Sequence, residues 1–384
     1  QGFYSELFLL TIVYIALFWL FGIIITLKLT RWIKMQKWKE NIRSIEPYIP
    51  GEQPQFSDMI KLNTNECPYP PSPMVEKVLK KCNYSNLRLY PSFTFKPLKE
   101  VLCKTYNIAE NEIFFGNGSD EVLALAFMTF FNSKKPTLFP DITYSFYDVW
   151  CNLYQIPFER IPLNEKFEFN VEDYKRENGG IVITNPNAPT GIYMELDSVE
   201  EIVKANQDSI VIVDEAYIDF GGKSAIDLIH KYENLVVVQT YSKSRALAGI
   251  RMGYAMANSY LIDAMKAVKN SFNSYTITTL SQDIATASAK DSQYLKECTD
   301  KIKSSRQWTV DELDKLGFET LPSSANFIFT TNKNIDAKDL FEYLKERRIF
   351  VRYFNKPRIN QYLRITIGTQ EQMESLVKAI KEYK

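Results

Sequence analysis

The chain has 384 residues, of which 45% are hydrophobic and 24% charged, enough for two domains with a sizeable core. Acidic and basic residues balance at 46 each, so the charge gives no reason to expect a nucleic-acid partner. His230 is the only histidine, and none of the five cysteines belongs to a CxxC pair. We therefore expect no metal site, no Ser-His-Asp catalysis and a reducing compartment. Proton transfer is left to Lys, Tyr, Asp, Glu or Cys.

An uncharged apolar run fills residues 7–27. About 20 apolar residues cross a bilayer as a helix, and the basic residues that follow from Lys28 favour a cytoplasmic C-terminal side. The run predicts a single-pass anchor for a cytoplasmic body. A second interpretation stays open, because the chain starts with Gln and Met35 opens a self-sufficient segment. Residues 1–34 would then be a fusion, or sequence translated upstream of the true start.

Four parts are expected along the chain. Residues 1–40 form the hydrophobic N-terminal segment and residues 41–60 a polar, turn-rich arm. A large domain over 61–287 and a smaller C-terminal domain over 288–384 follow.

Short β-rich runs alternate with helical stretches in the large domain, which predicts an α/β fold with a mainly parallel sheet covered on both faces. Ligands in such sheets bind beyond the carboxyl ends of the strands. The smaller domain reads as α+β. The strands expected are Ile113–Phe115, Thr137–Phe139, Ile181–Thr184, Ile210–Val213, Leu235–Gln239, Gly253–Ala257, Asn326–Thr330 and Leu363–Ile367, and the helices include Asp120–Phe131, Val199–Ala205, Ser288–Leu316 and Gln372–Tyr383.

Two turns at strand ends carry candidate binding residues. Gly118, Ser119 and Asp120 lie between a strand and an apolar helix, where free backbone N–H groups at a helix start bind phosphate. A helix cap with no ligand would look similar. The turn Thr184–Gly191 holds two prolines and aims Asn187 above the sheet, although a purely structural turn is the alternative.

Two later strand ends carry titratable groups. Asp214 directly follows an apolar strand, where its carboxylate would suit a protonated ring nitrogen or, alternatively, a helix N-cap, and Tyr217 could donate to a phenolate oxygen. Lys243 follows the strand LVVVQT, and its amine can form a Schiff base. Arg251, with the hydroxyls of Thr240 and Ser242, would make a phosphate clamp, unless the lysine and arginine are ordinary surface residues.

All four features occur in order, each at an expected strand end. Together they describe one cofactor, pyridoxal 5′-phosphate, whose ring is an electron sink and whose protein partners are a Schiff-base lysine and an acid at the pyridine nitrogen.

The sequence resembles the fold-type I, class I/II aminotransferases, and within them the histidinol-phosphate aminotransferase group. The resemblance covers residues from about 45 to 384. It rests on KLNTNECPYPPSP (61–73), LRLYPSF (87–93), FGNGSDEVL (115–123), ITNPNAPTG (183–191), VIVDEAY (211–217), TYSKSRALAGIRMGY (240–254) and YLRITIGT (362–369).

The resemblance implies a homodimer and a role for each residue. Lys243 would carry the cofactor, Asp214 would pair with the pyridine nitrogen, and Tyr217 would contact the ring oxygen. Tyr144 would stack on the cofactor ring, and Tyr90 would reach the cofactor phosphate from the partner subunit. Arg364 would bind the substrate anion with Arg352 beside it, and Tyr48 on the arm would close over the substrate. The residues around the cofactor phosphate would be Gly118, Ser119, Asp120, Ser242, Arg251 and Thr240.

Two positions depart from the family pattern. The family usually has Asn directly before Pro-Thr-Gly, where this chain has Ala188, so Asn187 stands one residue early. Many relatives carry Lys after the arm's glycine, where this chain has Glu52.

The expected activity is transamination between histidinol phosphate and 2-oxoglutarate in histidine biosynthesis, with Lys243 as general base and acid. Three alternatives stay open: a decarboxylase of threonine phosphate, an aminotransferase for another aromatic or phosphorylated donor, and a membrane-tethered protein that binds cofactor without turnover.

Overall fold

The structure is a computed structural model that describes residues 2–383, with side chains described for 8–30 and 37–383. Contacts divide the chain into two compact units, Gln1–Pro47 and Tyr48–Lys384. Each unit is described by itself.

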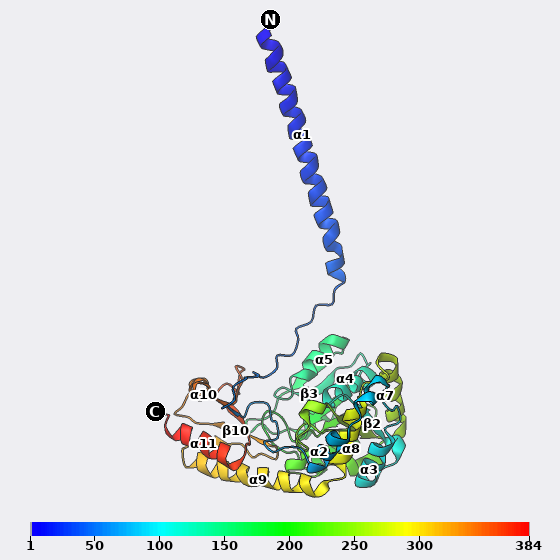
Figure 1. Cartoon of the computed structure of the whole chain (residues 1–384), viewed down its shortest axis with the longest axis vertical. Coiled ribbons are helices and arrows are strands. Elements are labelled where there is room, and N and C mark those ends of the chain that lie inside the picture. The colour runs from blue at the N-terminus through cyan, green and yellow to red at the C-terminus, as the bar shows by residue number, and fades with distance from the viewer. Residues whose placement is uncertain (1, 384) are drawn as a thin grey trace. The chain divides into compact units, whose positions relative to one another are not determined.

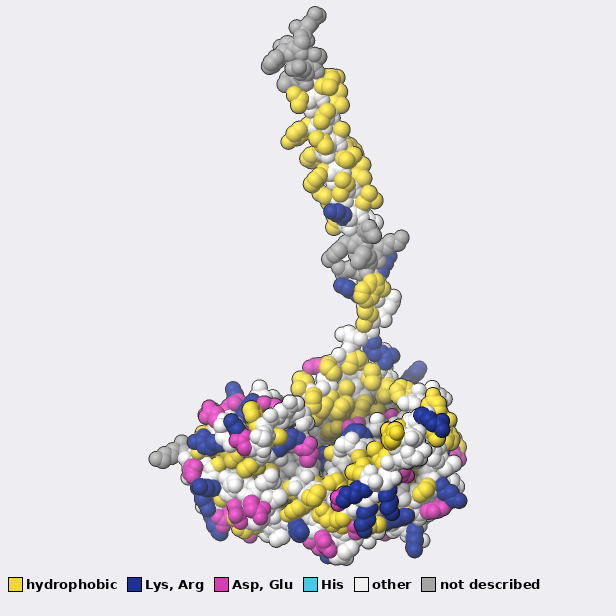
Figure 2. All heavy atoms as spheres, in the orientation of Figure 1, with side chains coloured by type: hydrophobic (Ala, Val, Ile, Leu, Met, Phe, Trp, Pro, Cys, Tyr) yellow, Lys and Arg dark blue, Asp and Glu magenta, His cyan; other side chains and the backbone are white. Residues whose placement is uncertain are grey.

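The N-terminal unit is one long helix, α1 (Gly2–Gln36), followed by a short 3-10 helix, Lys37–Asn41. Its segment Phe8–Thr30 is 23 residues long, and in length and composition it could cross a membrane. Hydrophobic side chains cover this segment and are exposed (Figure 2). The predicted apolar run lies within this helix, and Leu7 is outside the residues whose side chains are described.

The second unit is built around a seven-stranded sheet in the order β2-β8-β7-β6-β5-β3-β4. Only β8 runs against the others, so the mainly parallel α/β sheet is confirmed. Its strands are β2 (Ile113–Gly116), β3 (Thr137–Pro140), β4 (Phe158–Ile161), β5 (Gly180–Thr184), β6 (Val211–Asp214), β7 (Leu235–Thr240) and β8 (Gly253–Ala257).

Helices cover both faces of this sheet, as the apolar composition of its strands requires. Successive residues of β6 belong to different core clusters: Val211 and Val213 pack on one face and Ile212 on the other. The helices of this part are α2 (Pro73–Lys81), α3 (Lys96–Tyr106), α4 (Ser119–Phe130), α5 (Phe146–Tyr154), α6 (Leu196–Ala205), α7 (Ser259–Phe272) and α8 (Thr279–Ala289).

A second sheet, antiparallel and four-stranded, has the order β12-β13-β10-β9 and lies beside the helices of the C-terminal part (Figure 1). Its core is a separate cluster that includes Phe327, Ile365 and Leu376. The elements are α9 (Ser292–Asp314), β9 (Glu319–Thr320), β10 (Phe327–Thr331), α10 (Ala337–Glu346), β11 (Ile349–Phe350), β12 (Arg352–Tyr353), β13 (Leu363–Thr366) and α11 (Gln370–Lys381).

The arm ends in β1 (Ile60–Lys61), which pairs in parallel with β11. This pairing joins the arm to the C-terminal part, and the next residue, Leu62, continues the contact by donating to the Phe350 carbonyl at 2.7 Å and accepting from the Thr366 N–H at 2.9 Å. The expected helix Ser288–Leu316 corresponds to α9, which begins only at Ser292 because Asp291 is its N-cap and accepts the Tyr294 N–H at 3.2 Å, while Ser288 lies at the end of α8. The domain division at residues 287 and 288 remains a prediction.

Candidate active site

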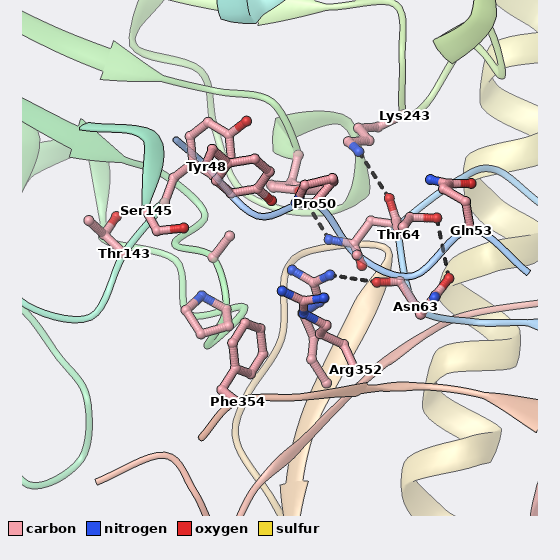
Figure 3. Close-up of a pocket in the computed structure, with 17 residues that line it drawn as sticks. Tyr48, Pro50, Gln53, Asn63, Thr64, Thr143, Ser145, Lys243, Arg352 and Phe354 are labelled. Carbon is pink, nitrogen blue, oxygen red and sulfur yellow. Dashed lines mark hydrogen bonds between the residues drawn. The ribbon is translucent and has the colours of Figure 1, made fainter. Parts of the chain in front are cut away.

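A cavity of about 230 Å³ lies where the carboxyl ends of the central strands meet the arm and the C-terminal part. The segments after β5, β6 and β7 each supply a wall, as the α/β topology requires. Figure 3 shows the side chains that converge there. The cavity is lined by Tyr48, Pro50, Gly51, Gln53, Asn63, Thr64, Asn65, Thr143, Tyr144, Ser145, Ala188, Pro189, Tyr217, Lys243, Arg352, Phe354 and Arg364.

Lys243 is the one lysine among the described residues that line this cavity. It stands three residues beyond the end of β7, and its Nζ donates a hydrogen bond to the Thr64 carbonyl at 3.3 Å (Figure 3). The Nζ lies 5.8 Å from the centre of the Tyr217 ring. The amine is therefore held at the cavity by a weak contact with a neutral group, with no described carboxylate pairing it.

Asp214 is the last residue of β6 and is buried. Its carboxylate accepts hydrogen bonds from the Tyr147 hydroxyl at 2.8 Å and the Ala216 N–H at 3.3 Å. Burial nevertheless raises the pKa of Asp214 to about 6. A cation beside the carboxylate would bring this pKa down again, which is what a protonated ring nitrogen would do.

Tyr147 was absent from the sequence-based site residues. It lies in the first turn of α5, whereas Tyr144 precedes the N-cap Ser145, and the two ring centroids are 5.7 Å apart. The available signal was its place shortly after the carboxyl end of β3.

The turn before α4 forms a cradle closed by Arg251. The start of α4 has no side-chain cap, and Gly118 adopts φ +84°. A Cβ added to Gly118 would lie 2.5 Å from Arg251 Nη2, and one added to Gly253 would lie 2.4 Å from the Ser119 nitrogen. Glycine at both positions therefore leaves backbone N–H groups and a guanidinium around a space for an anion, which fits a cofactor phosphate.

The Asp120 side chain contacts two other predicted site residues. Its carboxylate pairs with Arg251 Nη2 at 2.9 Å and accepts the Tyr144 hydroxyl proton at 2.9 Å. A carboxylate does not attract phosphate, so we assign the side chain to holding Arg251 and Tyr144 in position. Thr240 and Ser242 lie just before Lys243, buried and joined by a 3.0 Å hydroxyl contact.

Asn187, the candidate binding residue of the turn Thr184–Gly191, is not among the residues that line the cavity. Its amide donates to the Ile142 carbonyl at 3.0 Å and to Thr190 Oγ1 at 3.1 Å, and its oxygen accepts from Thr143 at 2.9 Å. Both ends of this amide are therefore bonded to protein groups, one in its own turn and two in the loop that follows β3. The cavity wall at this point is Ala188, with Pro189.

Two arginines face the cavity from the C-terminal part. Arg364 donates to the Asn63 carbonyl at 2.8 Å, while its buried Nε has no partner. Burial lowers the pKa of Arg364, and the nearby charge of Arg352 lowers it further. Neither arginine forms an ion pair with any carboxylate in the part of the chain that the structure describes. Two adjacent cations without an acid form an anion site.

The arm brings Tyr48 to the same cavity. Its ring stacks on Phe146, with centroids 4.2 Å apart and planes inclined by 20°. Burial raises the pKa of Tyr48, against the effect of the two arginines. Tyr90, in contrast, is 82% exposed, stacks on Tyr275 and does not reach the cavity of its own chain.

Comparison with known proteins identifies the enzyme family to which the chain belongs. The profile of the family Aminotransferase class I and II matches residues 57–380, so the chain belongs to this family. Enzymes of the family use pyridoxal 5′-phosphate, and the chain is an aminotransferase that depends on this cofactor.

Two similar proteins are histidinol-phosphate aminotransferases. The protein of Clostridium botulinum (strain 657 / Type Ba4) is 51% identical over 349 residues, which are 91% of this chain and 99% of that protein. The protein of Lactococcus lactis subsp. cremoris (strain MG1363) is 52% identical, over 90% of this chain and 97% of its own length.

The same fold occurs in the crystal structure of histidinol-phosphate aminotransferase from Sinorhizobium meliloti in complex with pyridoxal-5′-phosphate. Its TM-score is 0.77 at 22% identity, and the match covers 84% of this chain and 91% of that chain.

Proposed function

We propose that the chain transfers the amino group of histidinol phosphate to 2-oxoglutarate, in histidine biosynthesis. The observation that carries this proposal is the anion site of Arg352 and Arg364, which shares one cavity with Lys243. The similar proteins at about half identity are named for this activity.

The same site can serve both partners of the reaction. Histidinol phosphate carries a phosphate and no carboxylate, whereas 2-oxoglutarate carries carboxylates, and guanidinium groups bind either anion through paired N–H donors. A site of two arginines without a fixed protein acid suits this exchange.

Each residue then has a stated task. Arg352 and Arg364 orient the donor, and Tyr48 on the arm covers it. Lys243 would hold the cofactor through its amine and would move a proton at the substrate carbon, first as base and then as acid. Pyridoxal 5′-phosphate supplies the electron sink for this carbon. Asp214 keeps a positive charge at the ring nitrogen, and a 2-oxo acid completes the cycle through the same steps.

The test is a panel of amino donors assayed with 2-oxoglutarate. We expect histidinol phosphate to give the highest kcat/KM, above histidinol and the aromatic amino acids. Fastest turnover of an aromatic amino acid would assign the chain to the second aminotransferase alternative. Release of CO₂ from threonine phosphate would assign it to the decarboxylase.

We also propose that the active unit is a homodimer. Exposed apolar side chains are concentrated near Tyr90 in the chain, and Tyr90 and Phe93 both contact the exposed Tyr275. The exposed apolar residues of these two segments are Tyr84, Leu87, Leu89, Tyr90, Phe93, Phe272 and Tyr275. In a dimer joined through these residues, Tyr90 would complete the neighbour's phosphate cradle.

Mixed dimers test this arrangement. Lys243→Ala homodimers should be inactive, and Tyr90→Phe homodimers should need more cofactor. A mixed dimer should have one intact site, with Lys243 from one chain and Tyr90 from the other, and should regain activity at limiting cofactor. Differently tagged chains would verify the exchange of subunits. Exchanged chains without regained activity would show that Tyr90 serves its own subunit or none.

We further propose that α1 anchors the protein in a membrane, with the rest of the chain in the cytoplasm. A bilayer would remove its exposed apolar side chains from water. Basic residues follow the apolar segment, as in membrane anchors whose C-terminal side is cytoplasmic. The match to the Clostridium botulinum protein spans 99% of that protein but 91% of this chain, so part of this chain has no counterpart there.

A chain that starts at Met35 should be soluble and keep the kcat and KM of the full chain. The full chain should sediment with phospholipid vesicles, and the shortened chain should stay in the supernatant. Equal sedimentation of the two chains would reject the anchor, and an inactive or insoluble short chain would mean that the helix packs on the body.

A further inference from the structure

The hydroxyl of Tyr217 ends a buried chain of hydrogen bonds. Asn65 Nδ2 donates to this hydroxyl at 3.0 Å. The Oδ1 atom of Asn65 accepts from the Thr366 hydroxyl at 3.0 Å, and Thr366 Oγ1 accepts from the Asn65 N–H, also at 3.0 Å. Asn65 and Thr366 are 1% and 2% exposed, so water cannot replace these partners.

This network determines which way each proton points. Thr366 already accepts from the backbone N–H, so its own proton is free for Asn65 Oδ1. A flipped Asn65 amide would leave that buried proton without a described acceptor, which costs about 1–3 kcal/mol. The amide nitrogen must therefore face Tyr217. Since Tyr217 accepts from Asn65, its own proton is available to a different acceptor.

That proton has no acceptor among the described residues, and Tyr217 lines the cavity beside Lys243. Ala188, which packs in the same cluster as Tyr217, has no polar side chain, and the Asn187 amide is already bonded to the Ile142 carbonyl and to Thr190, so neither residue accepts this proton. A buried donor without a partner, directed at a cavity, indicates an acceptor on the bound molecule.

We propose that Asn65 is a positioning residue that, fixed by Thr366, holds the Tyr217 proton toward the phenolic ring oxygen of the bound cofactor. The inference requires bound pyridoxal 5′-phosphate but not histidinol phosphate as donor, so a different result from the donor panel would leave it intact.

The matched variant is Asn65→Asp. Asn65 has φ 57°, and Asp is, like Asn, a residue that tolerates this left-handed conformation. An aspartate carboxylate cannot donate to Tyr217 and would attract its proton away from the cofactor. The ring oxygen would become more basic and hold the proton of the lysine-linked nitrogen more tightly. The pH midpoint of the cofactor's visible absorbance should rise by about one to two units.

Tyr217→Phe provides the control, because it removes the hydroxyl through which Asn65 is proposed to act. Asn65→Asp should shift the midpoint in the Tyr217 protein and not in the Tyr217→Phe protein. An equal shift in both would show that the new charge acts directly, and would overturn the proposal.

A second variant, Thr366→Val, keeps the shape and removes the hydroxyl that orients the amide. It should raise the midpoint in the same direction by a smaller amount, again only when Tyr217 is present, whether or not Asn65→Asp folds. No shift in any variant that folds would overturn the proposal.

Discussion

The Lys243→Ala variant should lose both the yellow colour of the bound cofactor and all measurable transamination. The amine at this position links to the cofactor and afterwards moves the proton, and no second lysine lines the cavity in the described chain. General acid–base catalysis alone contributes about 10²- to 10⁴-fold, so losing both tasks should exceed the upper figure. Absorbance spectra of purified protein and single-turnover assays with histidinol phosphate would measure the two losses.

Lys61→Ala is the matched control. Lys61 also lies near Thr64, to whose hydroxyl it donates at 2.7 Å, but it does not line the cavity. This variant should keep the visible absorbance. An unchanged spectrum in Lys243→Ala would show that Lys243 is not the cofactor lysine, and loss of colour in both variants would show that the effect is not specific to position 243.

The parts of the site that sequence could predict share one property, which is that each lies at the carboxyl end of a strand. Asp214 ends the buried strand β6, Lys243 stands three residues beyond the buried strand β7, and the turn at Gly118 follows the buried strand β2. Local composition locates such strands, and the parallel topology then brings their ends together. The edge strand β4 was missed because its pattern is weaker, with exposed Glu159 and Arg160 in the middle.

The parts that sequence could not supply depend on contacts between distant segments. The Asn65 amide meets Tyr217 from 152 residues away, and Thr366 reaches Asn65 across 301 residues. No local pattern predicts such pairs. The hydrogen bond of the Asn187 amide also joins distant segments, because its acceptor is the Ile142 carbonyl of a different loop. The resemblance could mark Ala188 as unusual, but it could not show which residue takes over the role of the asparagine that the family usually has at this position.

Arg352→Ala should impair the phosphorylated donor far more than its unphosphorylated analogue. Arg352 lines the cavity beside Phe354 and has no carboxylate partner among the described residues, so its charge is free for a ligand (Figure 3). Losing a charge-assisted hydrogen bond costs about 1.5–3 kcal/mol, which corresponds to a roughly ten- to hundredfold loss in kcat/KM.

The alternative is that Arg364 alone holds the anion while Arg352 is a solvated residue at the rim. Comparing histidinol phosphate with histidinol separates the two cases, because only the first offers a phosphate to the guanidinium. Arg347→Ala is the matched control, since Arg347 is an exposed arginine of the same part whose guanidinium lies over Tyr343, away from the cavity. It should leave both donors unaffected. Equal losses on the two donors in Arg352→Ala would show that Arg352 does not recognise the phosphate, and would leave Arg364, already anchored to the Asn63 carbonyl, as the anion's main partner.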